Sequence, residues 1–238
     1  MKAARPVLLL SILFAAAPAF AQQGVSKVFG GITASAGQTS GDLDTVNGSI
    51  TIQSGARTGS AETVNGGIDV AASARTGDLS TVNGGIDIAE KASTGDIETV
   101  NGGIRVARDV VVDGGVEAVN GSIFVDRGSR IRGDVENVNG GIGLVGAQIG
   151  GGVETVRGDV TIGIDSRVKG GLKVEKSKGA FNLESKRDPR IVIGPNAVVE
   201  GPLVFERPVK LYVHTSAKIG PVTGATAQAF STPQPPKD

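Results

Sequence analysis

The segment TVNGGIDV at residues 63–70 is the unit from which most of this chain of 238 residues is built. Its copies are TVNGSITI (45–52), TVNGGIDI (81–88), TVNGGIRV (99–106), AVNGSIFV (118–125), NVNGGIGL (137–144) and TVRGDVTI (155–162). A weaker first copy, VFGGITA (28–34), has Phe29 where most others have asparagine. Measured at that position, successive copies lie 18 or 19 residues apart. A period this regular predicts a solenoid in which every copy forms one stacked unit.

Apolar residues recur at fixed places in the unit, one residue and four residues before the asparagine and three and five residues after it. In the copy around Asn83 these residues are Leu79, Val82, Ile86 and Ile88. Short alternating stretches of β-branched residues predict strands rather than helices. We therefore expect inward columns of valine and isoleucine to form the core.

Glycine marks the ends of these stretches. It follows the asparagine position in all eight copies and lies six residues before it in the last seven. Asn-Gly and Gly-Gly pairs are typical of corners that need a positive φ, so we expect bends there. The two 19-residue repeats place their extra residue at one corner, between Val106 and Gly114 and between Val125 and Gly133, which leaves the other two sides in register.

These features predict an all-β fold, a single-stranded parallel β-helix with about 18–19 residues and three short strands per coil. Stacked coils would lie about 4.8 Å apart. We expect a right-handed coil, by the general preference of parallel crossovers. A β-propeller is the main alternative, but its blades need roughly 40 residues each, which this period cannot supply.

The chain divides into four expected segments. Residues 1–21 form a cleaved signal peptide, with Lys2 and Arg5 before an apolar run and a small-residue cleavage site at 19–21. That run is too short for a membrane span, so we expect export to the periplasm or beyond rather than an anchor. Residues 22–162 are the regular coils, 163–222 are irregular terminal coils with a cap, and 223–238 are a disordered proline-rich tail. Residues 186–188 look like a loop that interrupts the stack.

The composition excludes several kinds of chemistry. The chain has no cysteine, which rules out disulfides, thiolate metal sites, thiol nucleophiles and a lipid-modified cysteine anchor. Its single histidine, His214, lacks the partners that a metal site or proton relay needs. Signal cleavage would leave 22 basic and 24 acidic residues, a formal charge of −2, which argues against nucleic acid as a partner. We expect no cofactor, no bound metal and no integral membrane segment in the mature chain.

Stacking places equivalent residues in columns. We expect a structural ladder of side-chain amides from Asn47, Asn65, Asn83, Asn101, Asn120 and Asn139. Threonines form one column at 45, 63, 81, 99 and 155 and a shorter one at 58, 76 and 94, and we expect them to face outward. A low-priority candidate for ligand binding is an acidic surface column of Asp44, Glu62, Glu98, Glu117, Glu136 and Glu154, interrupted by Ser80. Solvated surface charge explains that column better than a metal site, because calcium prefers clustered oxygens.

The VNGGIxV coils resemble those of exported bacterial adhesin-type β-helix repeat families. The segment IGPNAVVEGPLVF (193–205) is similar to bactofilins, which are polymer-forming proteins built from a short β-helix. The resemblance covers most of residues 25–222 and implies no catalytic residue. We therefore expect a non-enzymatic structural, adhesive or self-assembling element of the envelope or periplasm, with self-association or an envelope component as its partner. The alternative is a β-helix that binds a glycan or a cation, or, less expected, one that cleaves glycans.

Overall fold

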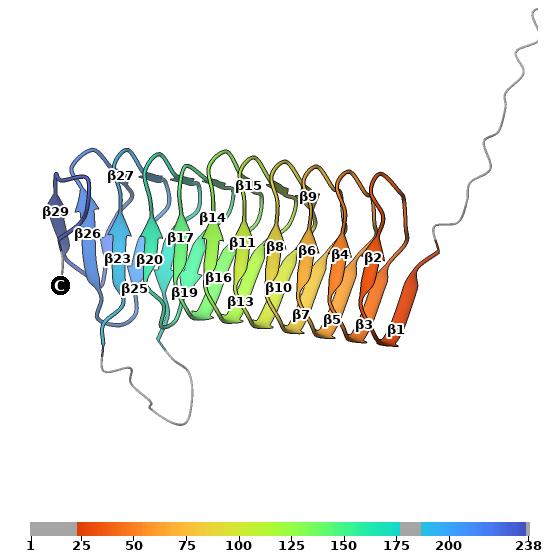
Figure 1. The fold of residues 1–238 in the computed structure, drawn as a ribbon. Helices are drawn as coiled ribbons and strands as arrows, with labels where there is room; N and C mark the ends of the chain where they lie inside the picture. Colours follow the sequence, from red (N-terminus) through yellow and green to blue (C-terminus); the bar gives the residue numbers. More distant parts are fainter. Residues whose placement is uncertain (1–22, 177–186, 237–238) are drawn as a thin grey trace, which may run out of the picture.

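The computed structural model describes residues 23–176 and 187–236, and these residues form a parallel β-solenoid of eleven coils (Figure 1). Strands of successive coils stack into three parallel sheets that run the length of the molecule, and the described residues contain no helix. The predicted fold class and the three-sided coil are therefore confirmed. The sides are unequal, because most strands have five residues in the first sheet, three in the second and two in the third.

The strands of each sheet follow the order of the coils. The first sheet comprises β1 (Val25–Phe29), β3 (Leu43–Asn47), β5 (Ala61–Asn65), β7 (Leu79–Asn83), β10 (Ile97–Asn101), β13 (Val116–Asn120), β16 (Val135–Asn139), β19 (Val153–Thr155), β22 (Leu172–Val174), β25 (Leu203–Phe205) and β28 (Val222–Thr223). The second comprises β2 (Ile32–Ala34), β4 (Ile50–Ile52), β6 (Ile68–Val70), β8 (Ile86–Ile88), β11 (Ile104–Val106), β14 (Ile123–Val125), β17 (Ile142–Leu144), β20 (Val160–Ile162), β23 (Arg190–Ile193), β26 (Lys210–His214) and β29 (Ala227–Phe230). The third comprises β9 (Ser93–Thr94), β12 (Val111–Val112), β15 (Arg130–Ile131), β18 (Gln148–Ile149), β21 (Arg167–Val168), β24 (Val198–Val199) and β27 (Lys218–Ile219), and isolated bridges extend it through Arg75 and Arg57 to Thr39.

The register joins equivalent positions of neighbouring repeats. Ile97 pairs with Val116 in the first sheet and Ile104 with Ile123 in the second, although these two repeats are 19 residues apart. The extra residue is taken up at Asp113, which follows β12 at the corner between the third and first sheets. An insertion at a corner therefore leaves the stacked faces undisturbed.

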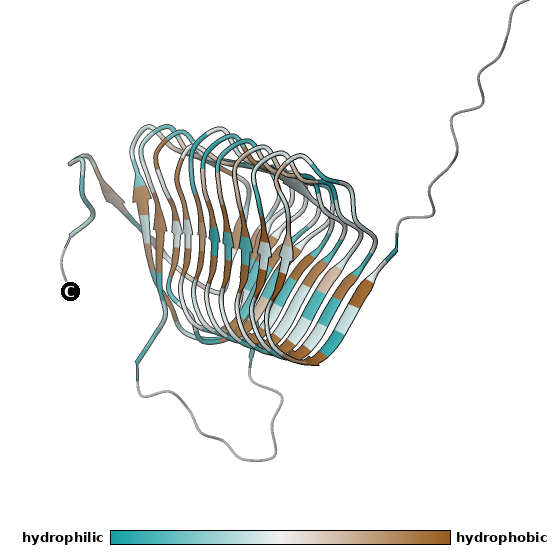
Figure 2. Ribbon diagram, turned by 45° about the vertical axis from the view of Figure 1, so that its right-hand side comes forward, coloured by the Kyte–Doolittle hydropathy of each residue, from teal (hydrophilic) through white to brown (hydrophobic). Residues whose placement is uncertain are grey.

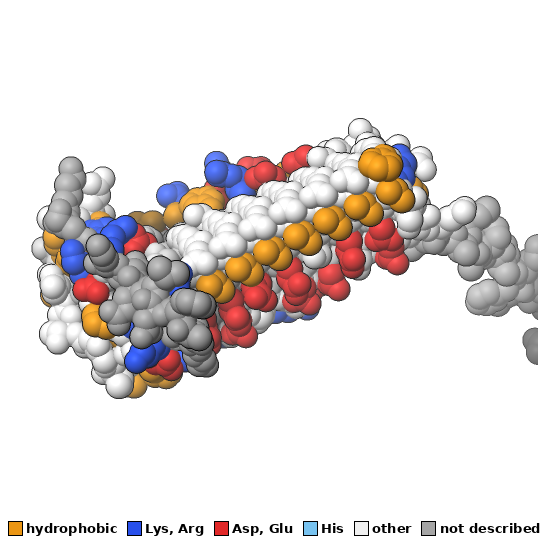
Figure 3. Space-filling model, turned by 90° about the horizontal axis from the view of Figure 1, so that it is seen from below, with side chains coloured by type: hydrophobic (Ala, Val, Ile, Leu, Met, Phe, Trp, Pro, Cys, Tyr) orange, Lys and Arg blue, Asp and Glu red, His pale blue; other side chains and the backbone are white. Residues whose placement is uncertain are grey.

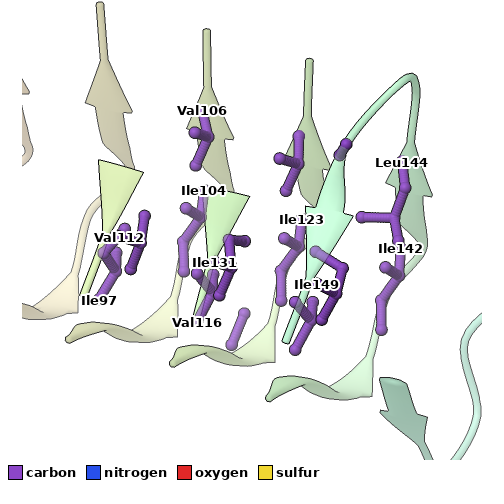
Figure 4. Packing of buried hydrophobic residues seen from close by; sticks show 14 of the residues in the cluster. Ile97, Ile104, Val106, Val112, Val116, Ile123, Ile131, Ile142, Leu144 and Ile149 are labelled. Carbon is purple, nitrogen blue, oxygen red and sulfur yellow. The ribbon is translucent and has the colours of Figure 1, made fainter. Parts of the chain in front are cut away.

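The core is a continuous column of apolar side chains enclosed by the three sheets. Figure 4 shows Ile97 and Val116 from the first sheet, Ile104 and Ile123 from the second and Ile131 from the third pointing into the same interior. Because each coil adds several fully buried aliphatic side chains, each worth about 1.5–3 kcal/mol, every coil is stabilised mainly by its neighbours.

The valine before each asparagine is not part of this core, which corrects the expectation from the sequence. Val46, Val64, Val82 and Val100 are each 40–41% exposed on the outer surface of the first sheet. In Figure 2 the hydropathy of the first sheet alternates across its strands in bands that continue from coil to coil. One apolar band therefore faces solvent.

The corner glycines also act differently from the prediction, because few of them have a positive φ. Gly84 and its counterparts at the corner between the first and second sheets are needed for close stacking. A Cβ on Gly84 would lie 2.0 Å from the carbonyl oxygen of Gly66. The left-handed position of most coils is instead in the turn after the second sheet. It is occupied by Gly37, Gly55, Ser73, Lys91, Asp109, Gly128, Gly146, Asp165 and Asn196.

The C-terminal region is more ordered than we expected. A disordered tail was predicted from residue 223, but β29 pairs with β26 as the last strand of the second sheet. Phe230 packs with Val192 and Tyr212 on the outer surface of that sheet, and the Arg190 guanidinium lies 5.0 Å from the Tyr212 ring and donates to the carbonyl of Pro236. The coils of residues 187–222 continue the same three sheets, so stacking extends through the region expected to be irregular.

Two expected features lie outside the described residues. These are the signal peptide at 1–21 and part of the loop expected at 186–188, of which the described chain includes only the last two residues. Across residues 23–176 and 187–236, the structure has no helix with the length and apolar character needed to cross a bilayer.

Candidate functional site

The threonine column of the first sheet faces the interior, which is opposite to the predicted orientation. Thr45, Thr63, Thr81, Thr99 and Thr155 are only 1–4% exposed. The Thr81 hydroxyl donates to the carbonyl of Gly66 at 2.8 Å, and Thr99 makes the same bond to Gly84 at 2.9 Å. Because a buried carbonyl without a partner is costly, the threonines at 45, 63, 81 and 99 satisfy the corner of the preceding coil. Its role is structural, and its hydroxyls are not available to a ligand at the surface.

The column changes character in two later coils. Ala118 replaces threonine in β13 and supplies no donor, whereas Asn137 in β16 donates to the carbonyl of Gly121 at 2.5 Å. The Asn137 amide oxygen is buried and has no hydrogen-bond partner. This position is therefore a local defect in an otherwise regular column.

The asparagines form a hydrogen-bonded ladder at the end of the first-sheet strands. Each side-chain amide donates to the amide oxygen of the preceding coil at 3.0 Å, from Asn65 to Asn47 and onward to Asn139 and Asn120. The first member, Asn47, donates to the carbonyl of Val28 at 3.3 Å. Because every internal amide is used twice within the ladder, its members link neighbouring coils.

The outer surface of the first sheet carries two further columns beside this ladder (Figure 3). The valine column consists of valines 28, 46, 64, 82, 100, 119 and 138, of which the first five are exposed and the last two are half-buried. The acidic column consists of the six predicted carboxylates, which the structure places in register on one face. Asp44 pairs with Glu62, Glu98 with Glu117, and Glu136 with both Glu117 and Glu154. In Figure 3 these columns appear as adjacent orange and red rows along the rod.

Burial and the neighbouring carboxylates both affect Glu136. Partial burial raises its pKa above the ordinary value of 4.5, and the charges of Glu154 and Glu117 raise the pKa further. A shallow hollow lies at this part of the surface, lined by the acidic column and by corner residues such as Asp96 and Asp134. The negative charge of this face is therefore concentrated in the four coils that contain β10, β13, β16 and β19.

The corner aspartates have a different task from the acidic column. The Asp96 carboxylate accepts the backbone N–H of Gly115 at 2.7 Å, and the Asp134 carboxylate accepts that of Gly152 at 2.6 Å. They cap the corner of the next coil and are engaged by the backbone. The acidic column ends where Lys173 replaces the acid, beside Glu154. The Lys173 ammonium donates a hydrogen bond to the Glu175 carboxylate, and this bond raises the pKa of Lys173.

The described residues hold no group of three or more carboxylate or imidazole side chains arranged to bind a metal ion. The acids of the column are spread along a flat sheet at one per coil, which is unlike the converging oxygens that calcium takes. His214 is in contact with its neighbours, since its Nδ1 lies 2.8 Å from the Ser216 hydroxyl and its ring packs edge-on against Phe230 at 5.1 Å.

Sequence reasoning missed a basic column on the third sheet. Outward positions of that sheet hold Arg57, Arg75, Arg130 and Arg167, all exposed. Arg167 is paired with Glu200 at 2.5 Å, but no carboxylate in the described residues contacts the other three. The column was not evident because Ser93, Val111 and Gln148 interrupt it. We call these arginines the arginine column.

The second sheet presents a mixed outer surface. Arg105 lies 3.7 Å from the Asp87 carboxylate and 5.8 Å from the ring centre of Phe124. Opposite charges are therefore combined within this face, whereas the first sheet is acidic and the third is basic.

Comparison with known proteins did not identify a family, since no family model, no curated protein and no solved structure matches the chain. The chain is therefore classified by its fold, as a parallel β-solenoid of about eleven coils.

Proposed function

We propose that this protein is a non-enzymatic structural rod, exported to the periplasm or cell envelope, that works by self-assembly. One observation carries the proposal: in the described residues, eleven coils stack into one rod whose outer surface carries columns of equivalent residues. Periodic surfaces suit repeated contacts, because equivalent positions recur at one spacing along the rod.

The use made of the polar residues supports a structural role. The inward threonines bond to corner carbonyls, the asparagines bond to one another and the corner aspartates bond to backbone N–H groups. The carboxylates that remain lie in a line along a flat face. Catalysis by paired carboxylates instead needs two groups facing a substrate across a cleft. The proposed export depends on the expected signal peptide. The resemblance to adhesin-type repeats and bactofilins supports the proposed structural role.

Self-assembly can be tested on the purified full chain with sedimentation velocity, light scattering and electron microscopy over a concentration series. We expect oligomers or filaments whose size increases with protein concentration. A chain that stays monomeric at every concentration and salt condition would refute the self-assembling role. Saturable calcium or glycan binding by such a monomer would favour the alternative of a ligand-binding β-helix.

A further inference from the structure

The two ends of the rod are obvious places for assembly, but they carry features that oppose it. At the N-terminal end, β1 pairs only with β3 among the described strands, and Lys27 occupies the register position of the inward threonines. Its ammonium group donates to the carbonyl of Gly31 at 2.8 Å. An inward-pointing charge on an edge strand is a known protection against edge pairing. At the other end, Pro221 precedes β28 and lacks a backbone donor.

The sides of the rod show the opposite property, because two of its faces are complementary. The first sheet carries the acidic column beside exposed valines, and the third sheet carries the arginine column. Each column has one position per coil, so the two share one spacing of about 4.8 Å, although uncharged residues occupy some positions of both. A contact between two acidic faces would bring like charges together, whereas an acidic face against a basic face would pair them.

From this complementarity we propose that copies of this chain pack side by side, with the acidic face of one copy against the arginine column of the next. The proposal rests on the proposed function and specifies how assembly occurs. Because the two surfaces differ, the contact is heterologous, and each copy keeps one free face of each kind. Such contacts produce closed rings or open arrays rather than simple dimers.

The distribution of charges along the two columns selects one register. Matched coil by coil in parallel rods, the facing positions are Asp44 with Arg57, Glu62 with Arg75, Ser80 with Ser93, Glu98 with Val111, Glu117 with Arg130, Glu136 with Gln148, and Glu154 with Arg167. All four arginines of the column then face an acid, and the uncharged Ser80 faces the uncharged Ser93. A slip of one coil in either direction leaves at least one arginine without an acid. The exposed valine column runs beside the acids and would be partly covered in this contact.

Charge reversal tests the pairing. One variant carries Glu62→Arg and Glu117→Arg, a second carries Arg75→Glu and Arg130→Glu, and a third carries all four changes. We expect each of the first two to require a roughly tenfold or higher concentration to assemble, since exposed ion pairs contribute modestly and two are reversed. Mixing the first two variants, or combining the changes in the third, should restore assembly. Melting curves verify that each variant is folded, and the exposed positions favour that result.

Cross-linking tests the register, because the chain has no native cysteine. The double variant Ser80→Cys, Ser93→Cys should form disulfide-linked multimers upon mild oxidation with copper phenanthroline. A control with Ser80→Cys and Thr161→Cys, which moves the second thiol to the outer surface of the second sheet, should form far fewer. Dimers of the single variant Ser80→Cys would indicate contact between two acidic faces and would overturn the proposal.

The two proposals fail in different ways. If the native chain never assembles, the proposed function is refuted together with the lateral contact. If it assembles but neither charge reversal nor salt changes the concentration required, the contact lies at the ends and only the lateral proposal is refuted. Rescue by the mixed variants has no explanation in an end-to-end contact, so it would support the lateral arrangement.

Discussion

Replacement of Asn137 by threonine should stabilise the protein. Asn137 occupies an inward position of β16 that is threonine in five other coils, and it is 3% exposed. Its amide nitrogen bonds to the carbonyl of Gly121, but its amide oxygen is buried without a partner. Asn137→Thr keeps a donor at this position and removes the unpaired oxygen.

The size of the effect follows from the two polar groups involved. An unsatisfied buried polar group costs about 1–3 kcal/mol, and that penalty is removed by the substitution. The hydroxyl of Thr99 bonds to its corner carbonyl at 2.9 Å, which shows that threonine fits this geometry. Threonine is also preferred over asparagine in strands, on a propensity scale that spans about 1 kcal/mol in total. We therefore expect the free energy of unfolding to rise by about 1–3 kcal/mol.

Urea unfolding followed by circular dichroism measures the effect. Asn137→Val is the matched control, because it removes the unpaired oxygen but also leaves the Gly121 carbonyl without its donor. It should gain less than Asn137→Thr. The reverse change, Thr81→Asn, should introduce the same defect into a regular coil and lower the midpoint. The reasoning is refuted if Asn137→Thr is no more stable than the native chain, or if the valine variant equals it.

Three further predictions concern the backbone and the acidic column. Gly84→Ala should destabilise the fold by at least about 3 kcal/mol, because its Cβ would lie 2.0 Å from the carbonyl oxygen of Gly66. The control Gly85→Ala should cost much less, because its Cβ would lie 3.2 Å from the carbonyl oxygen of Gly103. Equal urea midpoints for the two variants would contradict this prediction. Ser73→Gly should stabilise the fold by up to about 1 kcal/mol, since Ser73 has a φ of 60°, in the left-handed region. The control Ala72→Gly, at the neighbouring residue, should destabilise the fold instead. Thermal melting of the two variants measures both effects. Because burial and the neighbouring acids raise the pKa of Glu136 in the folded chain, its ionised form lowers stability at neutral pH, and that penalty disappears as the pH falls through the raised pKa towards 4.5. Glu136→Gln should therefore be more stable than the native chain at pH 7 and similar to it below about pH 4, and a difference that does not change with pH would exclude this explanation.

The sequence predicted the period, the three-sided coil and the position of the columns, because these depend only on which residues recur. It also contained the information needed to orient the first sheet. Leu79 and Val82 are three residues apart, so on a regular strand they must face opposite sides, whereas Leu79 and Thr81 share a side. In this coil the larger apolar residue, Leu79, faces the core, which turns the threonine inward and the valine outward. The alternation of side chains along the strand, together with hydropathy, therefore predicts which residues face the core.

Other features could not be read from the sequence. The left-handed position after the second sheet holds glycine in some coils and Ser73, Lys91 or Asp109 in others, so no single residue type identifies it. The corner glycines were recognised, but the reason for them, close approach of one coil to the next, needs the stacked backbone. The arginine column is similarly irregular, and its charge becomes evident only when distant residues are superposed in one sheet.

The acidic column poses a physical problem that a solitary rod leaves unsolved. Stacking sets neighbouring carboxylates about 4.8 Å apart, and two unit charges at that distance repel by roughly 0.9 kcal/mol in water before screening. Partial burial and, after it, this repulsion raise the pKa of Glu136. Within the described residues, Lys173 is the basic residue that follows in the same column, and it lies at the end, beside Glu154. Relief along the rest of the column needs cations from outside the rod, and in the proposed register the arginines of a second copy face four of the six acids. Glu136 faces Gln148, but its neighbours Glu117 and Glu154 would each face an arginine. The repeat that builds the core therefore also creates both surfaces of the contact, so lateral assembly needs no additional element of structure.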